Sequence, residues 1–159
     1  MENEDMVRSE LAAYLGAAWA HASLIEAARV VTLKFINYRP ENLPYTLWAL
    51  LEHIRLTQRD MLDFILDPDY QERDWPGDYW PDPELKATSA MWKETLKYYR
   101  EDAETLRAIV KDKGIGLTEA IAWGEGQTVL REVLQIIDHT GYHTGEFILM
   151  MQLAGVWKG

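Results

Sequence analysis

The chain has 159 residues, of which 48% are hydrophobic and 26% charged, and its formal net charge is −10. This length and composition predict one folded domain over residues 1–159, with a core large enough to be stable alone. The negative charge disfavours nucleic acids and anionic membrane surfaces as partners. Because the chain contains no cysteine, disulfides, thiolate metal sites and a cysteine nucleophile are excluded, which leaves His, Asp and Glu for any chemistry.

The N-terminal stretch MENEDMVRSE is acidic and lacks the basic and apolar regions of a signal peptide. No apolar run reaches the roughly 20 uncharged residues that a membrane helix needs. We therefore expect a cytoplasmic protein with no membrane partner, and the lack of cysteine fits a reducing compartment.

Apolar residues recur at helical spacing from Ser9 to about Asn37, which predicts a first helix with Ser9 as its cap. The two prolines of NYRPENLPY forbid a continuous helix, and Pro44 suits an early position of the next element. A second helix is expected from about Tyr45 to Leu66.

The stretch DPDYQERDWPGDYWPDP follows, and its prolines and aspartates predict a long irregular loop. A third helical pattern runs from about Pro83 to Lys111. Residues 114–127 contain four glycines and are expected to form a connection. A last helix is predicted from Thr128 to about Leu153.

No alternating Val/Ile/Thr-rich run suggests a strand, so the fold class expected is all-α. Four long helices indicate a four-helix bundle, in which ligand and metal sites are built from inward-facing side chains. The helical pattern alone does not determine the order of helix directions.

Two histidines in the last helix, His139 and His143, are four residues apart and therefore lie on one face, a spacing that lets two imidazoles bind one ion. Thr140 follows His139, so the glutamate of the zinc-protease motif HExxH is missing. His53 lies on a mostly apolar stripe of the second helix, and a bundle can bring it opposite the pair. Three neutral imidazoles plus water would form an open site for a divalent ion.

Ordinary packing is the alternative for each of these histidines, although burying three unpartnered imidazoles would be costly. For His21, a core histidine bonded to a neighbour is favoured over a fourth ligand or a proton shuttle. Glu146 shares a stripe with His139 and either orients an imidazole or is a surface carboxylate. Glu146 and His21 are the two candidates for a catalytic general base.

Two further features have simple structural interpretations. The aromatic residues Tyr70, Trp75, Tyr79 and Trp80 either cap the mouth of a pocket or pack over the bundle, and packing is favoured. The glycine-rich GEGQT, residues 124–128, precedes a helix, and a helix cap is favoured over an anion site.

Three stretches carry a family resemblance: LPYTLWALLEHIRLTQRDML, then DPDYQERDWPGDYWP, then GEGQTVLREVLQIIDHTGYHTGEFILMMQLAGVW. Together they resemble the DinB-like (DinB/YfiT) superfamily of metal-dependent enzymes from about His21 onward. The resemblance implies a homodimeric four-helix bundle, in up-up-down-down order with a long crossover, that holds a divalent metal by His53, His139 and His143. Relatives often carry Asn-Ala at positions 140 and 141 and Gln at position 146.

The resemblance also implies one divalent transition metal, Zn or Ni first, with Fe, Mn and Cu open. We expect a metalloenzyme that activates an external thiol or water, as in a thiol-dependent S-transferase or a hydrolase. The alternative is a non-catalytic stress or interaction protein whose metal stabilises the bundle. A plain bundle with packed histidines is the third possibility.

Overall fold

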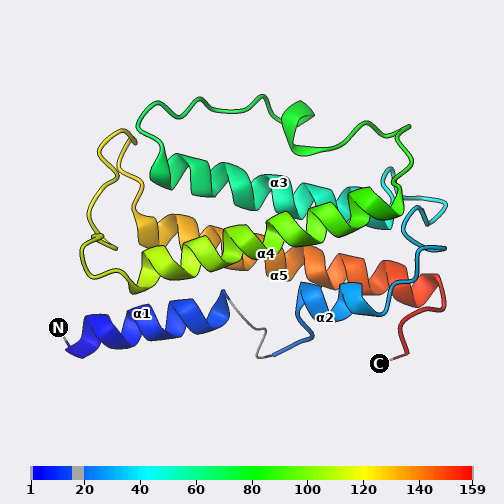
Figure 1. The fold of residues 1–159 in the computed structure, drawn as a ribbon, viewed down its shortest axis with the longest axis horizontal. Coiled ribbons are helices and arrows are strands. Elements are labelled where there is room, and N and C mark those ends of the chain that lie inside the picture. Colours follow the sequence, from blue (N-terminus) through cyan, green and yellow to red (C-terminus); the bar gives the residue numbers. More distant parts are fainter. Residues whose placement is uncertain (1, 16–19, 159) are drawn as a thin grey trace.

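The computed structural model describes residues 2–15 and 20–158, and within them every regular element is a helix (Figure 1). The elements are α1 (Glu2–Tyr14), α2 (Leu24–Arg29), α3 (Leu47–Leu66), the short 3-10 helix η1 (Gly77–Tyr79), α4 (Ser89–Lys111) and α5 (Val129–Leu153). In the described residues the sole pairing of β type is an isolated bridge between Ala120 and Thr128. The all-α class is confirmed.

Each of the three long helices begins directly after a threonine. The side chains of Thr46, Thr88 and Thr128 accept hydrogen bonds from backbone N–H groups three residues on, at 3.1, 3.3 and 3.2 Å. These bonds satisfy donors that have no partner inside the helix. The predicted starts of the second and last helices lie within two residues of the first residues of α3 and α5.

The third helix begins later than the pattern predicted, at Ser89 rather than near Pro83. Before it, the Asp82 side chain accepts from the backbone of Glu84 at 2.9 Å. Asn37 bonds both backbone groups of Ala87, at 2.8 and 2.9 Å. Side-chain bonds of this kind compete with helical ones and hold the segment irregular until the threonine cap.

The expected first helix from Ser9 to Asn37 is wrong. Ser9 lies inside α1, and α2 starts separately at a capping box in which Ser23 and Glu26 bond each other's backbone N–H groups. This box is a strong local start signal that apolar spacing does not register. Ala17 and Ala18, which fall within the predicted helix from Ser9 to Asn37, lie outside the described residues.

Contacts between helices define their directions. Trp48 bonds Thr95, and Arg59, farther along α3, bonds Asp102, farther along α4, so these two helices are parallel. Figure 1 shows α1 and α5 running the opposite way. The order is up, down, down, up, with α1 and α2 sharing the first position, and this corrects the expected up-up-down-down order. The long crossover, residues 67–88, is confirmed, because a parallel pair needs a connection as long as the helix.

Two apolar clusters form the core, and polar residues separate them. On α5 one cluster ends at Ile136 and the other begins at Phe147, with His139 and His143 between. On α3 a similar gap separates Ile54 from Leu62. We call the buried or half-buried polar residues of this middle layer the polar belt: His53, Thr57, Gln58, Asp60, Thr95, Asp102, His139, His143 and Thr144.

Among the described residues, no helix combines the length and apolar character needed to cross a membrane.

One arginine joins α1 to the end of α4. The Arg8 side chain is 3% exposed and donates to the carbonyls of Val110, Asp112 and Ile115 at 2.9, 2.9 and 2.7 Å. These carbonyls lie at or beyond the helix end, where intrahelical donors run out and a positive charge is favourable.

Replacing Arg8 with Ala should therefore lower the free energy of unfolding by about 3 kcal/mol, because three carbonyls lose a charged donor. Urea unfolding followed by circular dichroism measures the change. The matched control is Arg107→Ala, which removes an arginine paired with Glu104 on the helix surface and should cost under about 1 kcal/mol. Equal losses in the two variants would contradict this role.

Candidate metal centre

Three histidines from two helices converge in the polar belt. His53 comes from α3, and His139 and His143 come from successive turns of α5. One ring nitrogen of each lies within 4.8 Å of the others, and the Nε2 atoms of His53 and His139 are 3.2 Å apart. The spacing of four residues on α5 and the antiparallel packing of α3 and α5 together produce this cluster.

His53 is held on two sides by the crossover. Its Nδ1 donates to the backbone carbonyl of Tyr79 at 2.8 Å. The ring of Trp80 stacks on the imidazole with centroids 3.9 Å apart and planes at 4°. A carbonyl only accepts, so the hydrogen of a neutral His53 is on Nδ1 and the lone pair of Nε2 is directed at the other histidines.

His143 is oriented by a carboxylate from its own helix. Its Nδ1 donates to Glu146 Oε2 at 2.5 Å, which leaves Nε2 as the free ring nitrogen. A carboxylate behind a ligand imidazole is a common arrangement at metal sites, where it fixes the tautomer and increases ligand basicity. Glu146 also acts on Tyr45, whose pKa is raised first by burial and then by this negative charge.

Burial keeps the imidazoles of His53 and His139 neutral. It is the largest cause of the lowered pKa of His53, and it lowers the pKa of His139 to about 3 with further contributions from His143 and His53. Neutral imidazole is the form that binds metals. The two Nε2 atoms at 3.2 Å can share at most one proton in that state, so a cation between them would satisfy both lone pairs.

The donor set fits a transition metal. Two nitrogens bound to one Zn²⁺ at about 2.0–2.1 Å in tetrahedral geometry lie about 3.4 Å apart, close to the 3.2 Å between His53 and His139. The largest separation in the group, 4.8 Å, requires a small side-chain rotation. Three imidazoles suit Zn, Ni, Cu or Fe and leave a position for an external ligand.

The model of the DinB superfamily matches residues 17–147, which include all three histidines. The chain belongs to the DinB superfamily. No curated protein and no solved structure matches it.

In this DinB chain, the structure brings His53, His139 and His143 together, and it places Glu146 against His143. His21 is elsewhere, which corrects its expected inward orientation. It is exposed, lies before α2 rather than inside a helix, and its Nδ1 bonds the carbonyl of Ala22 at 2.9 Å. The helix break at Ser23 removes it from the stripe that predicted its burial.

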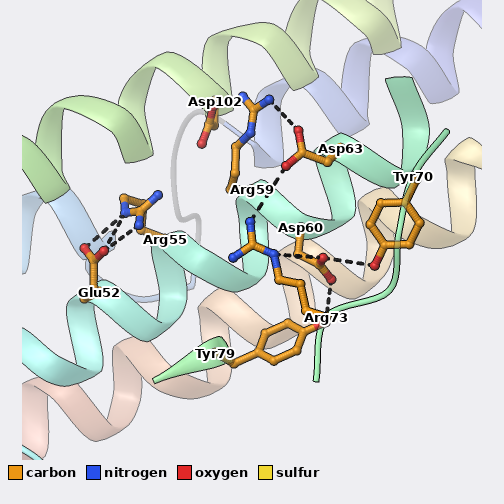
Figure 2. A network of polar contacts seen from close by, with 9 residues as sticks. All are labelled: Glu52, Arg55, Arg59, Asp60, Asp63, Tyr70, Arg73, Tyr79 and Asp102. Atoms are coloured by element: carbon orange, nitrogen blue, oxygen red, sulfur yellow. Dashed lines mark hydrogen bonds and ion pairs between the residues drawn. The ribbon is translucent and has the colours of Figure 1, made fainter. Parts of the chain in front are cut away.

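The aromatic loop of this DinB chain has a larger role than the packing that the sequence favoured. Trp80 covers one face of His53, Tyr79 supplies the carbonyl, and Tyr70 and Tyr79 both bond Asp60 on α3 (Figure 2). Trp75 is 67% exposed. The sequence signal was the pairing of Tyr with Trp in a proline-rich loop, but no spacing rule relates that loop to residue 53.

At the other end of the bundle, the favoured interpretation of GEGQT agrees with the structure, because Thr128 caps α5 by accepting from Arg131 N.

The lowered pKa of His139 predicts a pH-dependent stability of the metal-free protein. As pH falls from about 6.5 towards 3, the unfolded chain takes up a proton at this residue that the folded protein does not. Stability should therefore fall through that range by up to about 1.4 kcal/mol per pH unit.

His139→Gln removes the titration, so its urea midpoint should decline less steeply than that of the parent protein in the same acid range. Measurement in the presence of a chelator keeps both proteins metal-free. Parallel curves for the parent protein and the variant would show that burial does not lower the pKa of His139.

Proposed function

We propose that this DinB protein binds one divalent transition-metal ion through Nε2 of His53, His139 and His143. The observation that carries the proposal is the convergence of three imidazoles from α3 and α5, with the Nε2 atoms of His53 and His139 3.2 Å apart. Zn and Ni are the first candidates. Fe, Mn and Cu stay open, because a set of imidazole ligands does not discriminate strongly among these metals.

Catalysis is the finer part of the proposal. When bound, a divalent ion with an open position supplies a Lewis acid that lowers the pKa of a thiol or water. Around it, the chain's own residues perform the orientation. Tyr79 and Glu146 hold the Nδ1 protons of His53 and His143, and Trp80 keeps water from one face of His53.

We favour an external thiol as the activated group, in a thiol-dependent S-transferase type of reaction, and the alternative is activation of water in a hydrolase type of reaction. The chain has no cysteine, so the thiol must be a separate small molecule. Glu146 is already engaged with His143 and is poorly placed to act as a free general base. A thiol that ionises readily at a metal needs no strong base from the protein.

A second candidate is a non-catalytic protein in which the metal stabilises the bundle. The ligands come from two helices and lie between the two apolar clusters, so an ion would cross-link α3 and α5 where the core is least apolar. Metal binding to the folded state alone would then raise stability.

Ligand exchange separates the two functions. In Co²⁺-loaded protein, added azide or a small thiol should change the visible spectrum if a coordination position is open, whereas a closed structural site should not respond. The reactive form would then be screened for thiol transfer and hydrolysis. An unresponsive spectrum with strong metal-dependent stabilisation would favour the structural function.

Substitution tests the site itself. His53→Ala, His139→Ala and His143→Ala should each lose most bound metal, because two imidazoles hold an ion far more weakly than three, while helix content is retained. Metal content of untagged protein and circular dichroism measure both. The control is His21→Ala, which should keep its metal because His21 is exposed and outside the cluster. Loss confined to the α5 pair would refute the shared site.

A further inference from the structure

The crossover is attached to α3 by one buried carboxylate. Asp60 is 7% exposed, and it accepts hydrogen bonds from Tyr70 at 3.0 Å and from Tyr79 at 2.6 Å. It also forms an ion pair with Arg73, whose Nε is 3.2 Å from Asp60 Oδ1. Figure 2 shows the three crossover side chains meeting at this residue. Burial and the bond to Asp60 raise the pKa of both tyrosines, so each is a protonated donor at neutral pH.

Asp60 is in turn stabilised by a network of charges. Arg73 also approaches Asp63 at 3.8 Å, Asp63 pairs with Arg59, and Arg59 reaches Asp102 on α4 at 3.1 Å. An isolated buried carboxylate would be costly, whereas this one has a cation and two hydroxyl donors. The crossover therefore binds one fixed acceptor on α3, the carboxylate of Asp60.

Tyr79 connects this acceptor to the metal centre. Its hydroxyl bonds Asp60 and its backbone carbonyl accepts from His53, seven residues earlier on α3. Seven residues correspond to about 10 Å along a helix, so one residue is attached to α3 at two points that far apart. Trp80, the next residue, lies flat on His53. Movement of the Tyr79 ring would displace the two groups of the crossover that contact His53, the Tyr79 carbonyl and the Trp80 ring.

We propose that Asp60 is a positioning residue for the metal centre, acting through the Tyr79 hydroxyl to place the Tyr79 carbonyl and Trp80 against His53. The bond to the carbonyl keeps Nδ1 protonated and Nε2 directed at His139 and His143. The inference rests on the proposed metal-binding function, and it goes beyond it by assigning the crossover a role in holding one ligand.

The chain offers a matched pair of variants. Tyr70→Phe and Tyr79→Phe each remove one hydroxyl donor from the same carboxylate, from rings that are both half-buried in the crossover. A clamp that merely stabilises the fold predicts similar effects of the two. Positioning predicts a difference, because only Tyr79 carries the carbonyl that His53 uses, and Tyr79→Phe keeps that carbonyl in the chain.

The first measurement is the affinity of full-length protein for Zn²⁺ in competition with a chromogenic chelator, with the Co²⁺ spectrum as a second readout. Tyr79→Phe should weaken binding about tenfold and alter the spectrum, whereas Tyr70→Phe should change affinity less than about twofold. Asp60→Asn should resemble Tyr79→Phe. Equal affinities in the two tyrosine variants would overturn the proposal, and the tyrosine pair decides it if Asp60→Asn does not fold.

The second measurement uses metal-free protein, so that failure of the proposed function is recognised separately. Nitrogen-15 NMR of the imidazoles should show His53 as the Nδ1–H tautomer with a protected proton in the parent protein and in Tyr70→Phe. That proton should exchange faster in Tyr79→Phe. Absence of metal binding by the parent protein would refute the proposed function alone, whereas identical His53 signals in both tyrosine variants would refute the positioning role.

Discussion

The structure depends on the hydrogen bond from His53 Nδ1 to the Tyr79 carbonyl. This bond lies in the polar belt, between the two apolar clusters of the core. A buried imidazole needs a partner for each nitrogen, because leaving a buried polar nitrogen unpaired destabilises the fold by more than a typical hydrogen bond stabilises it. The crossover satisfies one nitrogen of His53 and thereby directs the other at α5. The same hydrogen bond therefore fixes both the position of the crossover and the orientation of His53 in the site.

That constraint gives the polar belt its character. Apolar packing at both ends of the bundle stabilises the helices, so the middle layer can hold polar groups whose burial would otherwise be unfavourable. His139 occupies this layer as a neutral base, and Glu146 and Tyr79 fix the protonated nitrogen of His143 and His53. Membership of the DinB superfamily and this cluster of three histidines both fit a metal-binding protein.

The outer residues of the site belong to a connection between parallel helices. Such a connection must travel back along the bundle, and here it does so over the histidine side of α3, where Asp60 holds it. The parallel order of α3 and α4 therefore has a chemical consequence. In an up-down-up-down bundle a short loop would join these helices, and no segment would cover His53.

The sequence by itself determined the all-α class and the approximate extents of α3 and α5, because apolar spacing and residues that start helices are local signals. It also singled out His53, His139 and His143 as candidate metal ligands. It did not determine the break before α2, where a capping box overrode the apolar pattern and left His21 exposed. Only the tertiary structure decided the helix directions, the stacking of Trp80 on His53 and the attachment of Tyr79 to Asp60. These are contacts between residues far apart in the chain or within an irregular loop, and no periodicity encodes which of them meet.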